Sequence, residues 1–101
     1  MPTKFQDRVY ELCSKVPKGR VVTYKAIAEA MRTKAYRAVG QALNKNPYAP
    51  KVPCHRVVNS QGHLHGFAHG LKAKARMLRK EGIKIKNNRI EDKKRIITKI
   101  R

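Results

Sequence analysis

Residues 23–44 read TYKAIAEAMRTKAYRAVGQALN, and this stretch decides the fold that the sequence predicts. Thr23 can cap a helix over about residues 25–31, because its hydroxyl can accept a hydrogen bond from a free backbone N–H group. After a turn at residues 32–34, apolar side chains return at helical spacing over about residues 35–44. Two short helices joined by a tight turn predict a helix-turn-helix whose second helix is the recognition element, although helical hairpins without a role in DNA binding share this pattern.

The rest of the chain adds helices and brief extended segments. A capping box at residues 3–6 begins a first helix over about residues 4–14, and a further helix over about residues 71–80 ends at Gly82. Extended segments are expected at residues 21–22, 57–58 and 83–85, and an irregular, proline-containing loop at residues 46–50. We therefore expect a mostly α, compact helical domain that is winged-helix-like and has one or two short strands.

Charge points to the class of partner. The chain has 101 residues, enough for one small domain, and its 25 Lys and Arg against 6 Asp and Glu give a formal net charge of +19. Such an excess is typical of proteins that bind polyanions, although a generally basic proteome is an alternative explanation. Nucleic acid is the partner that we expect.

Neither a membrane nor a disulfide framework is indicated. No apolar stretch approaches the ~20 residues of a membrane span, and the N-terminus lacks the apolar region of a signal peptide. We expect an intracellular protein, in the cytoplasm or with the nucleoid or nucleus. Cys13 and Cys54 are the only cysteines, and Cys13 falls on the apolar side of the first predicted helix. It is therefore interpreted as a small core residue.

The C-terminal third is the most basic part of the chain. Residues 71–101 hold 13 Lys and Arg against 3 Asp and Glu. We expect one domain over residues 1–86 and a basic tail over residues 87–101. Isoleucines in the tail could line one side of a helix, but the composition favours a solvated, partly ordered segment.

The run Pro53-Cys54-His55-Arg56-Val57 carries the chemistry. A thiol attacks only as its thiolate, so it needs a base or positive surroundings, and His55, Arg56 and Lys51 could supply both. A buried, inert thiol is the alternative for Cys54. In a basic chain with a helix-turn-helix, the run points to chemistry on a nucleic acid.

Five ordered motifs together resemble the C-terminal, active domain of the O6-alkylguanine-DNA alkyltransferases, also called methylated-DNA:protein-cysteine methyltransferases. The resemblance runs from about Phe5 to Ile85. Its motifs are Gly19-Arg20-Val21-Val22-Thr23-Tyr24, Arg37-Ala38-Val39-Gly40, Asn46-Pro47, Pro53-Cys54-His55-Arg56-Val57-Val58 and Lys80-Glu81-Gly82.

The resemblance implies a single-use reaction without a cofactor. Cys54 would displace guanine from its O6-alkyl group in one in-line step and remain modified as a thioether. His55 would act through a water as the base, and Glu81 would hold the imidazole in the required tautomer. Asn46 would tie the recognition helix to the active loop.

The same resemblance implies how the damaged base is bound. The base would be flipped out of the duplex at a cost of a few kcal/mol. Tyr24 would donate to the departing guanine or help to rotate its phosphate, the Val57 carbonyl would accept from the exocyclic amine, and the Ala68 N–H would donate to O6. Phe67 stands where many relatives have Tyr.

The resemblance also implies binding as a monomer in the minor groove of double-stranded DNA. Arg37 on the recognition helix would fill the space that the extruded nucleotide leaves, with Lys34 and Tyr36 flanking it. That groove suits a sequence-independent protein because its pattern of donors and acceptors is degenerate.

Other interpretations of these residues are open. Glu81 could be solvated and Tyr24 could be a packing residue. The histidines His63, His65 and His69 favour a wall of the substrate or phosphate site over a metal site, since no thiolate or carboxylate accompanies them.

Two other classes of protein compete with the repair protein. One is a non-enzymatic, alkyltransferase-like lesion binder, which would lack the acceptor cysteine that is present here at Cys54. The other is a small helix-turn-helix regulator or chromatin protein, which would leave the coexistence of Cys54, His55 and Glu81 unexplained.

Overall fold

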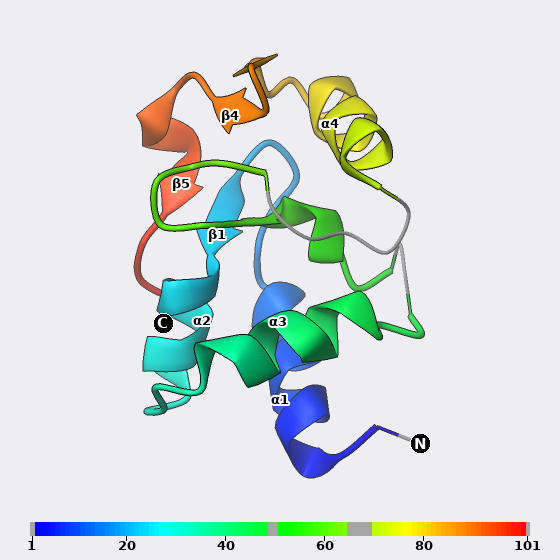
Figure 1. The fold of residues 1–101 in the computed structure, drawn as a ribbon, viewed down its shortest axis with the longest axis vertical. Coiled ribbons are helices and arrows are strands. Elements are labelled where there is room, and N and C mark those ends of the chain that lie inside the picture. Colours follow the sequence, from blue (N-terminus) through cyan, green and yellow to red (C-terminus); the bar gives the residue numbers. More distant parts are fainter. Residues whose placement is uncertain (1, 49–50, 65–69, 101) are drawn as a thin grey trace.

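The computed structural model describes residues 2–48, 51–64 and 70–100. It is helix-rich with short strands, as the sequence predicts (Figure 1). In chain order the elements are α1 (Lys4–Cys13), β1 (Val21–Thr23), α2 (Tyr24–Ala30), α3 (Tyr36–Asn44), the 3-10 turn η1 (Cys54–Arg56), β2 (Val57–Val58), α4 (Leu71–Lys80), β3 (Ile85–Lys86), β4 (Arg89–Ile90), the 3-10 turn η2 (Lys93–Arg95) and β5 (Ile96–Ile97).

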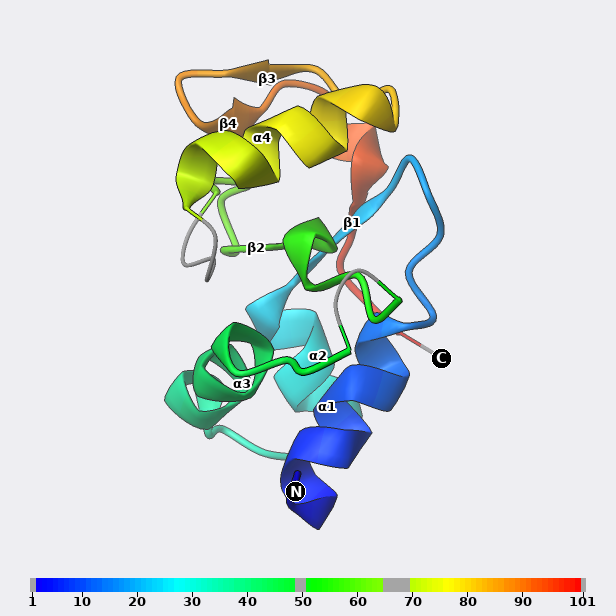
Figure 2. The same cartoon turned by 90° about the vertical axis from the view of Figure 1, so that its right-hand side faces the viewer.

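Helices α1, α2 and α3 pack together at one end of the molecule (Figure 2). The predicted capping box begins α1: the Thr3 hydroxyl accepts from the Gln6 N–H at 3.1 Å, and the Gln6 side chain accepts from the Thr3 N–H at 2.9 Å. The Thr23 hydroxyl caps α2 by accepting from the Ala26 N–H at 3.0 Å. Apolar faces of all three helices, including that of Cys13, form one core. The predicted helical hairpin and the core position of Cys13 are both confirmed.

A small parallel sheet joins the two ends of the molecule. Its strand order is β2-β1-β5, with Val22 of β1 opposite Val57 of β2 and Ile97 of β5. Strand β1 leads directly into α2, and β2 directly follows the turn that carries Cys54. The central strand therefore fixes the active loop relative to the helical hairpin.

The expectation of a solvated C-terminal tail is wrong. Strand β4 pairs with β3 in an antiparallel hairpin, and β5 pairs with β1. The side chain of Ile90 is buried, and the expected boundary at residue 86 falls inside the hairpin. The basic composition of this segment led to the wrong expectation, because its basic side chains face solvent while its isoleucines make the apolar contacts. The described residues thus hold five short strands instead of one or two.

A second core lies between α4, the hairpin and the sheet. Its buried side chains come from segments that are far apart in the chain: Val21, Val58, Leu64, Ala75, Leu78, Ile83, Ile85 and Ile90. Helix α4 is thereby held across the sheet from the helical hairpin (Figure 2). Within the described ranges, no helix is long and apolar enough to cross a membrane.

Candidate active site

Cys54 is the first residue of η1 and lies at the end of a loop that Asn46 holds in place. The Asn46 side-chain amide donates to the Val52 carbonyl at 2.8 Å, and its oxygen accepts from the Tyr48 N–H at 2.9 Å. The Cys54 N–H in turn donates to the Val52 carbonyl at 2.9 Å. Asn46 follows α3 directly, so these contacts connect the second helix of the hairpin to a thiol that is 8% exposed.

Glu81, just after α4, receives hydrogen bonds from both residues that follow Cys54. His55 Nε2 lies 3.1 Å from Glu81 Oε2, and Arg56 donates to both carboxylate oxygens, from Nε at 2.9 Å and from a terminal nitrogen at 2.6 Å. Arg56 also donates to the Val16 carbonyl at 2.9 Å. The family resemblance implies the pairing of His55 with Glu81. The spacing of residues in the sequence did not predict that Arg56 also binds this carboxylate.

The charges of this cluster follow from its burial. Burial raises the pKa of Glu81, but the hydrogen bonds from Arg56 and His55 outweigh it, and the net pKa lies below 4.5. Burial lowers the pKa of His55 below 6.5 in spite of the carboxylate beside it. At neutral pH, Glu81 is therefore ionised and His55 is mainly neutral. Because a carboxylate only accepts, the proton of the neutral ring belongs on Nε2 and the free lone pair on Nδ1.

Lys74 is a charged residue of this site that sequence reasoning missed. Its side chain is fully buried on α4, and its ammonium lies 6.0 Å from the centre of the Tyr24 ring. Burial lowers the pKa of Lys74 to about 8, against the opposing effect of the Cys54 and Cys13 thiolates. Lys74 is therefore mostly protonated at neutral pH, and it is a buried positive charge that interacts electrostatically with Cys54.

A signal for Lys74 was present in the sequence. It stands four residues before Leu78 and seven before Glu81, so all three lie on the same side of the helix axis. A lysine at a position of the apolar face is unusual, since buried lysines are rare unless they are paired or functional.

Tyr24 opens α2 and borders a pocket on the outer side of the helical hairpin. Burial raises the pKa of Tyr24 to about 12, and the Cys54 thiolate adds to the shift, so its phenol stays protonated. The pocket has a volume of about 480 Å³. Its lining residues are Tyr24, Tyr36, Arg37, Gly40, Gln41, Asn44 and Asn59.

The other expected residues are distributed as follows. Tyr36 and Arg37 are exposed on α3, and Lys34 is exposed in the turn before it. Val57 is buried in β2 beside β1. Phe67 and Ala68 lie outside the described residues, as do His65 and His69 of the histidine cluster. In the part of the chain that the structure describes, no group of three His, Cys, Asp or Glu side chains could hold a metal ion.

Comparison with known proteins identifies the family. Residues 4–83 match the family model described as the DNA binding domain of 6-O-methylguanine DNA methyltransferase. The chain belongs to this family.

Two curated family members illustrate the similarity. The methylated-DNA--protein-cysteine methyltransferase of Methanosarcina barkeri is 46% identical over 80 residues, which are 78% of this chain and 51% of the relative. The protein of the same name from Metallosphaera sedula is 51% identical over 82 residues, which are 81% of this chain and 51% of the relative. The chain thus spans about half the length of the curated relatives that it matches.

Two solved structures illustrate the similarity of the fold. Mycobacterium tuberculosis OGT in complex with DNA has a TM-score of 0.77 and 39% identity, with 80% of this chain and 51% of that chain covered. S. pombe Atl1 in complex with damaged DNA containing O6-carboxymethylguanine has a TM-score of 0.83 and 27% identity, with 97% of this chain and 99% of that chain covered. The 6-O-methylguanine DNA methyltransferase model ends at residue 83, so β3, β4 and β5 lie beyond it.

The contacts of Glu81 predict a large effect on stability. Glu81→Gln should lower the free energy of unfolding by about 2 to 4 kcal/mol, because it leaves Arg56 partly buried without its carboxylate. Glu11→Gln is the matched control: it breaks the exposed pair of Arg8 and Glu11, and should cost no more than ~0.5 kcal/mol. Urea denaturation of both variants measures the difference. Equal losses in the free energy of unfolding would show that the contacts of Glu81 stabilise the fold no more than an exposed ion pair does.

The pKa shifts also fix the sign of the pH dependence. Both His55 and Glu81 have a lower pKa in the fold than in the unfolded chain, so the unfolded chain binds more protons at acid pH. The contribution of these two groups to stability should therefore be complete above pH 6.5, fall as His55 would protonate, and fall again below pH 4.5. In Glu81→Gln the second decrease should be smaller, which thermal unfolding at several pH values will show.

Proposed function

We propose that this chain repairs DNA by transferring an alkyl group from O6-alkylguanine irreversibly to Cys54, which makes it a single-use methylated-DNA:protein-cysteine S-methyltransferase. The observation that carries the proposal is the nearly buried Cys54, which is followed in the chain by His55, held by Glu81, and which interacts electrostatically with the buried ammonium of Lys74. The names of the curated relatives support the same reaction. The chain would then correspond to the C-terminal, active domain of such proteins.

The reaction begins with the thiol proton. The Nδ1 lone pair of neutral His55 takes this proton from Cys54 through a water, and Glu81 stabilises the imidazolium that forms. Arg56 keeps the carboxylate in place throughout. Lys74 favours the thiolate electrostatically until the sulfur attacks.

One displacement then completes the chemistry. The Cys54 sulfur forms a bond to the alkyl carbon while the bond from that carbon to O6 breaks, and the electron pair leaves with guanine. The guanine is protonated by the proton that His55 took from the thiol, returned through water, while the phenol of Tyr24, which its raised pKa keeps protonated, can donate a hydrogen bond to the departing base. The product is a thioether and an unmodified guanine, and nothing in the proposal restores the thiol.

The target base would enter from the side of the helical hairpin. In this proposal α3 lies in the minor groove of double-stranded DNA, and Arg37 takes the place of the extruded nucleotide. Tyr36 and Lys34 would contact the sugar and phosphates beside it, and the Val57 carbonyl, with Phe67 and Ala68, would border the base. Mycobacterium tuberculosis OGT and S. pombe Atl1 were both solved in complex with DNA.

A second candidate function is lesion binding without transfer. The similarity to S. pombe Atl1 favours it, since that protein was solved with damaged DNA containing O6-carboxymethylguanine and matches this fold with a TM-score of 0.83. In that case the pocket beside α3 would hold an O6-alkylguanine and mark it for another protein. Cys54 distinguishes the two functions, because a pure binder needs no thiol at that position.

Intact-mass analysis tests the proposed transfer. After incubation with a duplex that contains O6-methylguanine, the protein should gain one methyl group, mapped to Cys54, and no more than one per molecule. Cys54→Ser should gain none and still bind the lesion, while the matched control Cys13→Ala should gain one. Tight binding by the unaltered protein without any gain in mass would establish the lesion binder instead.

Lys74→Met tests the electrostatic part of the mechanism. Removal of the buried charge should slow transfer from a free O6-alkylguanine base on the order of tenfold at neutral pH, and the rate should recover as the pH is raised and more thiolate forms. Lys72→Met, at an exposed position of the same helix, should leave the rate unchanged. Single-turnover rates from pH 6 to 9 provide the profile. A lower rate with an unmoved pH profile would assign Lys74 a structural role only.

Arg37→Ala separates base flipping from the displacement. The variant should transfer from duplex DNA on the order of a hundredfold more slowly, because the extruded base is no longer replaced in the stack. Transfer from the free base should be nearly normal, because that substrate needs no flipping. Single-turnover rates on the two substrates give the contrast. If both rates fall by the same factor, Arg37 supports the fold or the active loop.

A further inference from the structure

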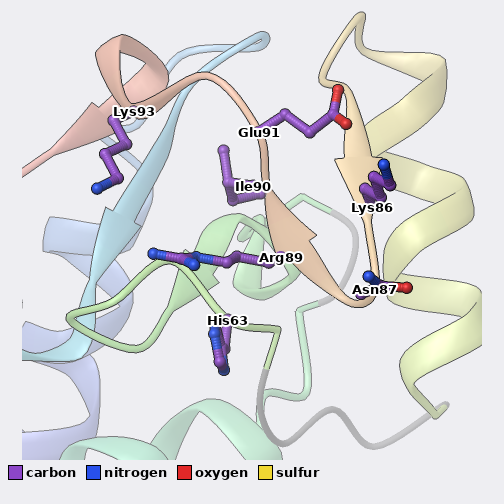
Figure 3. Close-up of a pocket in the computed structure, with 7 residues that line it drawn as sticks. All are labelled: His63, Lys86, Asn87, Arg89, Ile90, Glu91 and Lys93. Carbon is purple, nitrogen blue, oxygen red and sulfur yellow. The ribbon is translucent and has the colours of Figure 1, made fainter.

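Basic side chains also gather at the β3–β4 hairpin, apart from the thiol site. They border an open pocket of about 730 Å³ between the hairpin and the turn at residues 59–64 (Figure 3). His63, Lys86, Arg89 and Lys93 line it, with Glu91 as the opposing charge. The family match ends at residue 83, so it covers the His63 side of the pocket and none of the hairpin.

The backbone around this pocket is held in place by hydrogen bonds. His63 and Arg89 form an antiparallel bridge, the Ile90 N–H donates to the Gly62 carbonyl at 2.9 Å, and the Leu64 N–H donates to the Asn88 carbonyl at 2.8 Å. The side chain of Ile90 anchors the hairpin in the second core. The charges are therefore carried on a fixed framework, which lowers the entropy that a ligand must overcome.

The side chains divide between two sides of the hairpin. Figure 3 shows the guanidinium of Arg89 and the ammonium of Lys93 extending to the same side, while Glu91 extends to the other, where Lys86 also lies. The side of Arg89 and Lys93 thus presents positive charge at a distance from the carboxylate. Such a surface favours an anion with several oxygens.

The pocket adjoins the proposed DNA-binding face. Asn59 lines the pocket beside α3, and it exchanges hydrogen bonds with His63 of the hairpin pocket: its side chain accepts from the His63 N–H at 2.8 Å, and its own N–H donates to the His63 carbonyl at 3.0 Å. In Figure 2, α3, this turn and the hairpin follow one side of the molecule, and the loop at residues 14–20 lies on the other.

The dimensions agree with one continuous ligand. The longest axis of the molecule is 34 Å. Since base pairs of B-form DNA are ~3.4 Å apart, a duplex that crosses α3 and continues to the hairpin needs about ten base pairs. A flanking segment of the same duplex would therefore reach Arg89 and Lys93.

We propose that the pocket formed by His63, Arg89 and Lys93 binds backbone phosphates of the DNA that flanks the target base. The site is a second electrostatic contact and plays no part in the displacement at Cys54. It rests on the proposed binding of DNA at α3. Its ligand chemistry is a phosphate oxyanion, and the source is the duplex itself instead of a free anion.

The test compares salt dependence for two lengths of undamaged duplex. With about 24 base pairs, Arg89→Gln/Lys93→Gln should weaken binding about tenfold near 0.1 M salt and lower the slope of log K against log salt by about 1 to 2. With about 8 base pairs centred on α3, the double variant should bind like the original protein. Fluorescence anisotropy at several salt concentrations measures both.

Control variants separate this site from general effects of charge and folding. Lys15→Gln/Lys18→Gln removes the same charge from exposed positions that do not line the pocket and should lower the slope less. Lys93→Gln alone leaves the backbone pairing of the hairpin intact and should give part of the effect. Glu91→Gln should tighten binding to the long duplex, a change that a folding defect cannot produce.

The proposal is overturned if the two double variants have the same slope, or if the short and long duplexes lose affinity equally. A further result would also overturn it. Inorganic phosphate would raise the Tm of the original protein but not that of Arg89→Gln/Lys93→Gln, while the two proteins would have the same slope of log K against log salt for DNA. The pocket would then hold a free anion. Failure of the proposed function is distinguishable: the original protein would then not bind DNA or would not transfer a methyl group. Transfer from the free base should be unchanged in Arg89→Gln/Lys93→Gln.

Discussion

The carboxylate of Glu81 connects the chemistry of this protein to its fold. It receives hydrogen bonds from His55 and from Arg56, and Arg56 reaches on to the carbonyl of Val16. Through Arg56 and Glu81, three segments are therefore joined: the loop after α1, the turn that carries Cys54, and the end of α4. Because an ionised group at low exposure must be fully hydrogen-bonded, the same contacts that orient His55 also fix where α4 ends.

Burial gives the thiol its surroundings. Cys13 and Cys54 are both nearly excluded from solvent, but their environments differ. Burial raises the pKa of Cys13 to about 12, which leaves it an inert core residue. Cys54 lies beside a neutral imidazole and a buried ammonium, so a proton acceptor and a stabilising charge are both in place. Lys74 remains buried at a cost in solvation, and such costs are typical of functional sites.

The basic residues of the chain lie in two kinds of place, the interior of the proposed site and the surface of the molecule. Lys74 and Arg56 lie inside the molecule at the proposed site, whereas Arg37 and the residues of the hairpin pocket lie on the surface. In the proposed function the surface charges lie beside α3 and beside the β3–β4 hairpin, in a molecule that is longer than it is wide. A duplex is the ligand whose length and charge match such an arrangement.

The sequence by itself determined the helices and the helical hairpin, because capping residues and helical periodicity are local along the chain. The pairing of His55 with Glu81 followed from the family resemblance of the ordered motifs. The sequence did not determine the end of the chain: β5 forms only because β1 offers it an unpaired edge, and a two-residue strand has no periodicity of its own. Nor did it reveal the burial of Lys74 or the hold of Arg56 on Glu81. Those features depend on which segments pack against one another, and only the tertiary structure decides whether a basic side chain faces water or a buried partner.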